Sequence, residues 1–268
     1  MERTPHTTPV IKVKGLTMRF GDRLIQEHID LSLEPGEIFA VMGGSGSGKS
    51  TLLKHLVGLL PPAGGRVLYG DAQGGQGGVT DYWASDEATR QQLRRRVGML
   101  FQSAALWTSM DVLDNVCLPL SLQPEKPSLA DQQARAMEVL QWVGLADAAR
   151  RMPSQLSGGM KKRVGLARAI VAEPAILFLD EPSAGLDPIA SRRLDELILD
   201  IRERTGAAML LVSHELPSLM DLADDGIFFD ADSKRPIAHG APKDLCDHAH
   251  PTVRAFMRRE SLPTPASA

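Results

Sequence analysis

One stretch of the sequence constrains the fold more than any other, because it fits the pattern G-x-x-x-x-G-K-[ST]. The stretch reads Gly43-Gly44-Ser45-Gly46-Ser47-Gly48-Lys49-Ser50 and is followed by Thr51. The apolar run at residues 38–42 is typical of a buried strand, and apolar residues at helical spacing after the loop predict a helix that ends at Pro61-Pro62. A flexible glycine linker is the alternative, but the flanking strand and helix favour a phosphate-binding loop.

The residue types in this loop suit a bound nucleotide. Glycines let backbone N–H groups turn toward an anion, and the following helix adds its unpaired N-terminal donors and the positive end of its dipole. The Lys49 ammonium would reach the β- and γ-phosphates, and the Ser50 hydroxyl would ligate Mg²⁺. The loop therefore predicts a nucleotide-binding protein.

Composition and charge exclude some classes of protein. The 268 residues can bury one large core or two smaller ones, and the net charge of −3 gives no reason to expect a nucleic-acid partner. No stretch approaches the roughly 20 apolar residues that cross a bilayer, and residues 1–6 lack the apolar segment of a secretory signal. Cys117 and Cys246 have no metal-like spacing, so we expect incidental or buried thiols in a reducing cytoplasm.

Strands and a long helical stretch are predicted on both sides of the loop. Residues 10–13 and 29–33 read as strands, the first of them followed by a turn signal at Lys14-Gly15. A strand at 97–101 ends at Gln102, and residues 103–172 are mostly helical after Pro119, Pro124 and Pro127 interrupt the chain. We predict a helical subdomain inserted into an α/β core.

The core resumes with two apolar strands at 175–179 and 207–212, which a helix joins into a right-handed βαβ unit. Strands near 226–229 and 236–238 close the sheet. The chain is expected to begin with a disordered lead-in over 1–9 and to end with a helical extension and tail over 241–268. The glycines at 74–78 read as a surface loop, because no Lys-Ser pair follows them.

Two further motifs carry chemistry. Asp180-Glu181 ends a predicted strand at its carboxyl end, where ligands bind in open α/β sheets. Adjacent carboxylates are expected to alternate in direction along a strand, so one can hold Mg²⁺ and the other can polarise an attacking water. A pair of capping acids is the alternative, which the glycine-rich loop disfavours. Ser157 is a predicted N-cap, and Gly158, Gly159 and a basic helix face follow it, which makes a second anion site. The chain thus has two predicted phosphate-binding sites but only one Lys-Ser pair. This combination predicts two chains that share two nucleotides across an interface.

Six motifs occur in the order found in ABC-type ATPases, which the chain resembles over about residues 10–240. They are the loop at 43–50, Gln102, Leu156-Ser157-Gly158-Gly159-Met160, Ile176-Leu177-Phe178-Leu179-Asp180-Glu181, Ser183-Ala184-Gly185-Leu186-Asp187 and His214. The resemblance implies a P-loop NTPase (RecA-like) α/β core with an N-terminal antiparallel β-subdomain and an inserted helical subdomain. It implies one ATPase domain over 10–240, with ATP and Mg²⁺ as its ligands.

The resemblance also implies a role for each matching residue. The catalytic set is Glu181 as base, His214 as switch histidine, Lys49 and Gln102; the metal set is Ser50, Gln102 and Asp180; the nucleotide set is Phe20, residues 43–51, Ser157, Gly158, Gly159 and Asp187. Phe20 stands where the family stacks an aromatic ring on adenine, more often a tyrosine. For His214, a core or surface histidine is the alternative, which its place at the end of a predicted strand disfavours.

A closer resemblance is to the ATPase of Mla/Mce-type phospholipid transporters. It rests on residues 98–107, 157–164, 186–189, 213–216 and 251–256, and above all on Met160-Lys161-Lys162, where many importers have glutamines. This resemblance implies a second copy of the chain, a transmembrane permease and an Mce-type lipid-binding protein as partners. It places the chain peripherally on the cytoplasmic face of the inner membrane.

Other readings remain open. The chain could serve another ABC importer or exporter, or be a non-transport ABC protein in iron–sulfur assembly. The ABC proteins that act on ribosomes or DNA ends are disfavoured, because this chain has one cassette, no heptad block and no excess of basic residues. A non-catalytic nucleotide-binding module is disfavoured by Glu181 and His214. The apolar segment Ala104-Ala105-Leu106-Trp107 either docks a helix of the membrane subunit or packs inside the helical subdomain.

Overall fold

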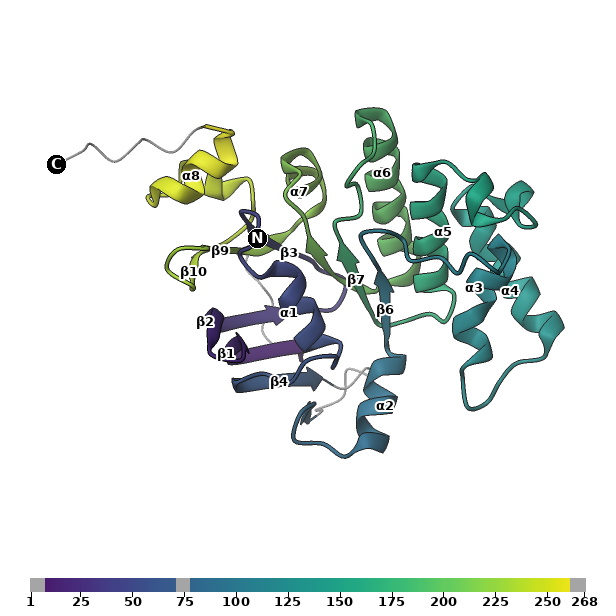
Figure 1. The fold of residues 1–268 in the computed structure, drawn as a ribbon, viewed down its shortest axis with the longest axis horizontal. Helices are drawn as coiled ribbons and strands as arrows, with labels where there is room; N and C mark the ends of the chain where they lie inside the picture. The colour runs from purple at the N-terminus through teal and green to yellow at the C-terminus, as the bar shows by residue number, and fades with distance from the viewer. Residues whose placement is uncertain (1–7, 71–77, 261–268) are drawn as a thin grey trace.

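The computed structural model describes residues 8–70 and 78–260, which form two sheets flanked by helices (Figure 1). Residues 1–7 of the predicted lead-in, residues 74–77 of the predicted glycine loop and the tail after residue 260 lie outside the described residues. The predicted α/β architecture is confirmed, because helices and strands alternate along the chain and the larger sheet is mainly parallel.

The smaller sheet is antiparallel and has the order β2-β1-β4-β5. Its strands are β1 (Ile11–Phe20), β2 (Arg23–Leu33), β4 (Gly64–Gly70) and β5 (Val79–Asp81). The turn signal at Lys14-Gly15 does not end β1. The register against β2 shifts between Val13 and Leu16, where Gly15 has a φ of 55°, so a bulge accommodates the glycine and the strand continues.

The larger sheet has the order β10-β9-β3-β8-β7-β6. Its strands are β3 (Ile38–Gly43), β6 (Val97–Leu100), β7 (Ile176–Asp180), β8 (Ala208–Val212), β9 (Asp225–Phe229) and β10 (Pro236–His239). Every neighbouring pair is parallel except β9 with β10. The carboxyl ends of β3, β7 and β8 therefore share one edge of the sheet, the edge where open α/β sheets bind ligands.

Helix α1 (Lys49–Leu56) follows β3 through the glycine-rich loop and is shorter than predicted. The prediction that it ends at Pro61-Pro62 is wrong. Gly58 has a φ of 79°, and a Cβ atom added there would lie 1.8 Å from the hydroxyl oxygen of Tyr82. The left-handed glycine, packed against Tyr82, turns the chain away before the prolines are reached.

The chain between β6 and β7 is helical. It contains α3 (Val112–Ser121), α4 (Leu129–Trp142) and α5 (Gly158–Ile170), which gather at one end of the molecule in Figure 1. Helix α2 (Glu87–Arg95) precedes β6. Pro119 does not interrupt the chain as predicted but lies in the last turn of α3, where a proline removes a single helical hydrogen bond.

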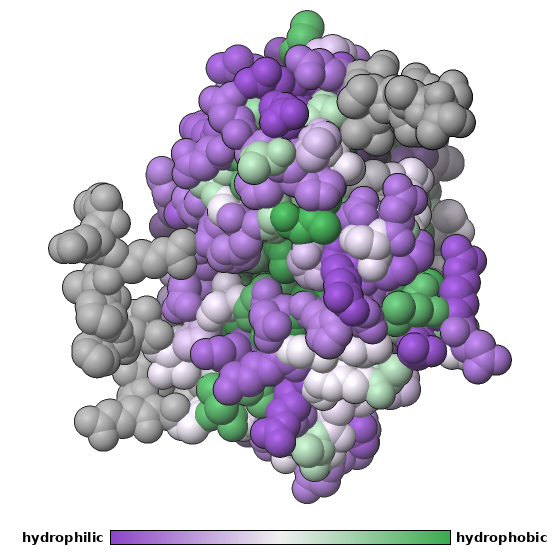
Figure 2. Space-filling view, turned by 90° about the vertical axis from the view of Figure 1, so that its left-hand side faces the viewer, coloured by the Kyte–Doolittle hydropathy of each residue, from purple (hydrophilic) through white to green (hydrophobic). Residues whose placement is uncertain are grey.

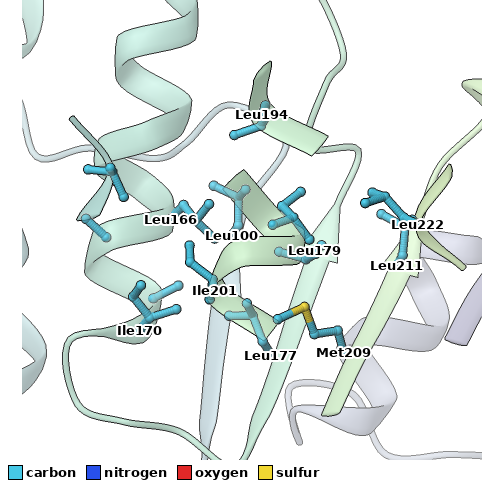
Figure 3. Packing of buried hydrophobic residues seen from close by; sticks show 14 of the residues in the cluster. Leu100, Leu166, Ile170, Leu177, Leu179, Leu194, Ile201, Met209, Leu211 and Leu222 are labelled. Carbon is cyan, nitrogen blue, oxygen red and sulfur yellow. The ribbon is translucent and has the colours of Figure 1, made fainter. Parts of the chain in front are cut away.

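Apolar clusters cover both faces of the larger sheet. Figure 3 shows one of them, in which Leu166 and Ile170 of α5 and Ile201 of α6 (Pro188–Thr205) pack with Leu177 of β7. The next residue of β7, Phe178, belongs to the opposite cluster, with side chains of α1 and of the smaller sheet. Burial on both faces fixes the strand ends, and with them the loops that the strands carry.

The C-terminal part of the described chain packs beside β9 and β10 (Figure 1). It comprises α8 (Pro251–Arg258) and a 3₁₀ turn at Asp244–Asp247. Helix α7 (Leu216–Leu222) precedes β9 and packs on α6, and two more 3₁₀ turns lie at Ala146–Ala148 and Pro153–Gln155. Figure 2 views the molecule from this side, where hydrophilic residues predominate and hydrophobic ones form small groups. Over residues 8–70 and 78–260, no helix combines the length and the apolar character that a bilayer span requires.

Candidate active site

The glycine-rich loop joins β3 to α1 and is tightly packed at its two ends but not in its middle. A Cβ atom added at Gly43 would lie 2.3 Å from the carbonyl oxygen of Phe229, and one added at Gly48 would lie 2.7 Å from Ile25. Cβ atoms added at Gly44 or Gly46 would meet nothing within 4 Å. The loop is therefore held against the protein at its two ends and is open in the middle, where an anion can approach its backbone.

Gln26 of β2 braces this loop from behind. Its side chain is fully buried, and its amide nitrogen donates to the carbonyl oxygens of Ser47 at 2.9 Å and Asp230 at 2.7 Å. One amide thus ties the glycine-rich loop to the chain that follows β9. The sequence analysis missed Gln26, because a single polar residue in an apolar strand gives no indication of its partners.

Lys49 lies over the loop and is 8% exposed. Its ammonium donates to the carbonyl oxygens of Gly43 and Gly44, each at 2.8 Å. Burial lowers the pKa of this lysine, and the nearby carboxylates of Glu181 and Asp180 act in the opposite direction. The side chain is thus positioned to place a positive charge at the open middle of the loop.

The residues predicted to hold Mg²⁺ fit that ion. The Ser50 hydroxyl donates to Oδ1 of Asp180 at 2.9 Å, which brings two hard oxygen ligands together at the start of α1. Burial raises the pKa of Asp180, the Ser50 hydrogen bond lowers it, and the charge of Glu181 raises it again. Gln102, which is exposed, lines one cavity with Lys49 and a neighbouring one with Asp180, so it can approach both.

Glu181 and His214 meet across the ends of β7 and β8. Glu181 is 8% exposed, and its carboxylate lies 2.8 Å from Nδ1 of His214. The two acids do not alternate along a strand as expected: β7 ends at Asp180, and Glu181 has a φ of 48°. This left-handed conformation, rather than the pleat of a strand, separates the directions of the two carboxylates.

One cavity of about 650 Å³ collects most of the predicted site. Its predicted lining residues are Phe20, Gly44, Ser45, Gly46, Gly48, Lys49, Ser50, Thr51, Gln102, Glu181 and His214. Gly43 and Ser47, the other two residues of the loop, are buried. Phe20 is 48% exposed, so its ring is available to a ligand. Phe256 of α8 also lines this cavity and was missed, because nothing in the sequence indicates that the C-terminal extension returns to the loop.

A second cavity, of about 830 Å³, is lined by the predicted residues Ser157, Gly158, Gly159 and Asp187. Ser157 is the N-cap of α5 and accepts from the backbone N–H of Met160, while Asp187 is the N-cap of α6. Cβ atoms added at Gly158 or Gly159 would have no neighbour closer than 3.8 Å. Packing within the chain therefore does not require glycine at either position. The absence of a side chain there lets a ligand or partner outside the chain approach the backbone closely.

The basic run after Ser157 is not one exposed helix face, so that expectation is wrong. Lys162 is 5% exposed, and its ammonium donates to the backbone carbonyl oxygen of Glu181 at 2.8 Å. The guanidinium of Arg163 donates to the carbonyl oxygen of Val143 at 3.1 Å. Periodicity could not distinguish these inward side chains from solvated ones.

A glycine-rich loop with its lysine, a hydroxyl–carboxylate pair and a second acid beside a histidine define a P-loop NTPase. Residues 26–184 match the family model described as ABC transporter. The chain belongs to the ABC transporter ATP-binding family, whose members bind and hydrolyse ATP, and it is an ATPase. The resemblance and the fold class inferred from the sequence are thereby confirmed.

Three comparisons illustrate the similarity. The intermembrane phospholipid transport system ATP-binding protein MlaF of Haemophilus influenzae is 38% identical over 252 residues, covering 94% of this chain and 91% of that protein. The methionine import ATP-binding protein MetN of Mesorhizobium japonicum is 40% identical over 222 residues, covering 83% of this chain and 58% of that protein. A dimeric post-hydrolysis structure of the ATP-binding cassette MJ0796 with ADP and Pi has a TM-score of 0.73 at 27% identity, covering 85% of this chain and 97% of that chain.

Proposed function

We propose that this chain is the ATP-hydrolysing subunit of a phospholipid transporter. The observation that carries the proposal is the match to MlaF, which extends over 91% of that relative, whereas the match to MetN extends over 58%. The alignment with MlaF thus takes in nearly the whole of that relative, and the alignment with MetN takes in little more than half of that one. The Met160-Lys161-Lys162 segment supports the same assignment.

Each residue of the first cavity has a distinct task in this proposal. Lys49 and the loop N–H groups bind the β- and γ-phosphates, and Phe20 stacks on adenine. Glu181 accepts a proton from the attacking water, and His214 orients the Glu181 carboxylate through the 2.8 Å contact. Ser50 and Asp180, with Gln102 beside them, would hold Mg²⁺, which would supply positive charge to neutralise the phosphates.

The working unit in this proposal is a pair of identical copies. Ser157, Gly159 and Asp187 lie on a different cavity from Lys49, so one copy does not surround a nucleotide by itself. Two copies packed with these cavities facing each other place Ser157 of one against the γ-phosphate held by Lys49 of the other. The similarity to a dimeric cassette with ADP and Pi supports this arrangement.

Phe20→Ala is expected to raise the ATP concentration for half-maximal rate by about tenfold, since stacking a base on an aromatic ring contributes ~1–3 kcal/mol. The maximal rate should change much less, because the ring touches the base and not the reacting phosphate. Steady-state hydrolysis over a range of ATP concentrations measures both. Phe20→Tyr keeps the ring and serves as the control. An unchanged half-maximal concentration in Phe20→Ala would move adenine stacking to another residue.

For the apolar segment after Gln102 the sequence left open docking of a membrane-subunit helix or packing inside the helical subdomain. In the structure two of its residues differ in this respect. Leu106 packs against the apolar core, but Trp107 is 57% exposed. The Asn115 side chain accepts from the Trp107 N–H at 2.8 Å and donates to the Trp107 carbonyl oxygen at 3.0 Å. A fixed backbone that holds an exposed indole is the arrangement of a binding anchor, so we assign Trp107 to docking of the permease.

Trp107→Ala is expected to uncouple ATP hydrolysis from the membrane partner while the isolated subunit keeps its melting temperature, because exposed side chains contribute about 0.5 kcal/mol or less to stability. The measurements are thermal unfolding of the subunit and hydrolysis by the reconstituted complex. Leu106→Ala is the matched variant and should lower the melting temperature, since Leu106 packs on the core. A large drop in the melting temperature of Trp107→Ala as well would indicate that both side chains pack inside the helical subdomain.

The phospholipid assignment is tested by what accompanies the chain. We expect the tagged chain, purified from detergent-solubilised membranes, to bring a transmembrane permease, an Mce-type lipid-binding protein and phospholipid, identified by mass spectrometry. Recovery from the membrane fraction through the permease would also agree with a peripheral position on the cytoplasmic face. A complex with neither Mce-type protein nor phospholipid would contradict the cargo and leave the ATPase of another transporter.

A further inference from the structure

Lys162 is a buried charge that the functions assigned so far do not use. It is the fifth residue of α5, it is 5% exposed, and its Nζ donates to the carbonyl oxygen of Glu181 at 2.8 Å. A lysine is rarely buried to this degree without partners of opposite charge, because removing its ammonium from water is costly. Its partners should therefore explain why it is there.

Two acids lie near enough to offset its burial: Glu181, which lines the first cavity, and Asp180, at the end of β7. Burial lowers the pKa of Lys162, and the charges of Glu181 and Asp180 act against that change. Lys49 faces the same two carboxylates from the glycine-rich loop. The pair of acids is thus flanked by two ammonium groups, one on the phosphate-binding loop and the other on α5.

The hydrogen bond from Lys162 acts on an unusual turn. Glu181 has a φ of 48°, a conformation that residues other than glycine seldom adopt without support from their surroundings. Four contacts hold it there: its N–H donates to the Val212 carbonyl oxygen at 2.8 Å, its carboxylate meets His214, and its carbonyl oxygen accepts from Lys162 at 2.8 Å and from the Ala184 N–H at 3.2 Å. Without Lys162 the carbonyl oxygen keeps only the longer bond from Ala184, so the turn that orients the carboxylate is held less firmly.

We propose that Lys162 is a positioning residue that holds Glu181 in its catalytic orientation and links it to the helix that begins at Ser157. The proposal rests on the proposed role of Glu181 as base. Ser157 lies at the start of α5, five residues before Lys162, on the cavity that faces the second copy. One helix therefore connects the surface that meets the partner's nucleotide to the base that acts on the chain's own nucleotide.

Lys162→Met is expected to lower the maximal rate of ATP hydrolysis by about 100-fold, the size of effect that a misplaced catalytic group produces. The half-maximal ATP concentration and the affinity for a fluorescent ATP analogue should remain close to those of the parent chain, because Lys162 does not contact the cavity that holds the nucleotide. Lys162→Gln retains an N–H donor and should lose less activity than Lys162→Met. Lys126→Met, which changes an exposed lysine between α3 and α4, is the control and should act like the parent chain.

A double-mutant cycle distinguishes positioning from general stabilisation. In a Glu181→Gln chain the base is already lost, so adding Lys162→Met should change the residual rate by less than about threefold. Equally large losses in both backgrounds, or weaker binding of the analogue, would overturn the positioning role. If Lys162→Met fails to fold, Lys162→Ala takes its place: a rate equal to that of the parent chain overturns the positioning role, and a lower rate whose effect disappears in the Glu181→Gln background supports it.

The cycle also separates this proposal from the one on which it rests. Near-native hydrolysis by Glu181→Gln alone would remove the base assignment and the role of Lys162 together. A large loss in Glu181→Gln with none in Lys162→Met would leave the base in place and reject only the positioning role.

Discussion

Glu181→Gln is expected to lower the rate of ATP hydrolysis by about 10²–10⁴-fold, the contribution typical of a positioned general base, while ATP remains bound. The amide has nearly the shape of the carboxylate and can keep the contact with Nδ1 of His214, but it cannot accept a proton from water. Steady-state phosphate release and equilibrium ATP binding, measured on the same preparation, test both parts. Near-native hydrolysis would remove Glu181 from the catalytic role.

Lys49→Ala provides the contrast that makes this result specific. Lys49 contacts the loop carbonyls and would contact the phosphates, so its loss should weaken ATP binding itself. One substitution therefore traps ATP and the other prevents its binding, although both lower the rate. Loss of ATP binding in Glu181→Gln as well would indicate damage to the fold rather than to the chemistry.

Mixing two inactive chains is expected to restore hydrolysis, because each nucleotide site draws on both copies. A Ser157→Arg chain has an intact phosphate-binding loop, and a Lys49→Ala chain has an intact Ser157 surface. A mixed dimer then contains one complete site and one site that is damaged on both sides. The rate should rise with mixing and be highest near equal amounts, whereas either chain alone should be nearly inactive.

The control for this experiment is a mixture of Ser157→Arg with a chain that carries both substitutions. That dimer has no complete site, so mixing should restore nothing. Size-exclusion chromatography with ATP verifies that the copies associate. Full activity of either single variant as a monomer would contradict the shared site, and the second cavity would then need another role.

The parts of the site that local chemistry determines were predictable from the sequence. The glycine-rich loop requires a strand before it and a helix after it, and both are present at the predicted place. The helix starts at Ser157 and Asp187 depend on a side chain that accepts from the backbone two or three residues later, so they also follow from neighbours in the sequence. The carboxyl ends of β3, β7 and β8 then bring Lys49, Asp180 and His214 together through sheet order alone.

The parts that distant residues determine were not predictable. Helix α1 ends early because of a contact between Gly58 and Tyr82, 24 residues later. The inward direction of Lys162 depends on the backbone carbonyl oxygen of Glu181, which follows the next strand. A run of basic residues has the same pattern whether it is solvated or buried. Phe256 reaches the first cavity only because the C-terminal extension packs back on β9. These three errors concern contacts between segments rather than the identity of a segment.

The brace formed by Gln26 has a mechanical consequence. Its amide joins the small sheet to Ser47 of the phosphate-binding loop and to Asp230, which follows β9 of the large sheet, so one side chain connects these three parts. Phe20, at the end of the strand paired with β2, belongs to the small sheet too. The ring proposed to stack on adenine and the loop proposed to bind the phosphates are therefore connected through one side chain. If the cavity closes around ATP, we expect the movement in the opposite wall, where Gln102 leads into the helical segment.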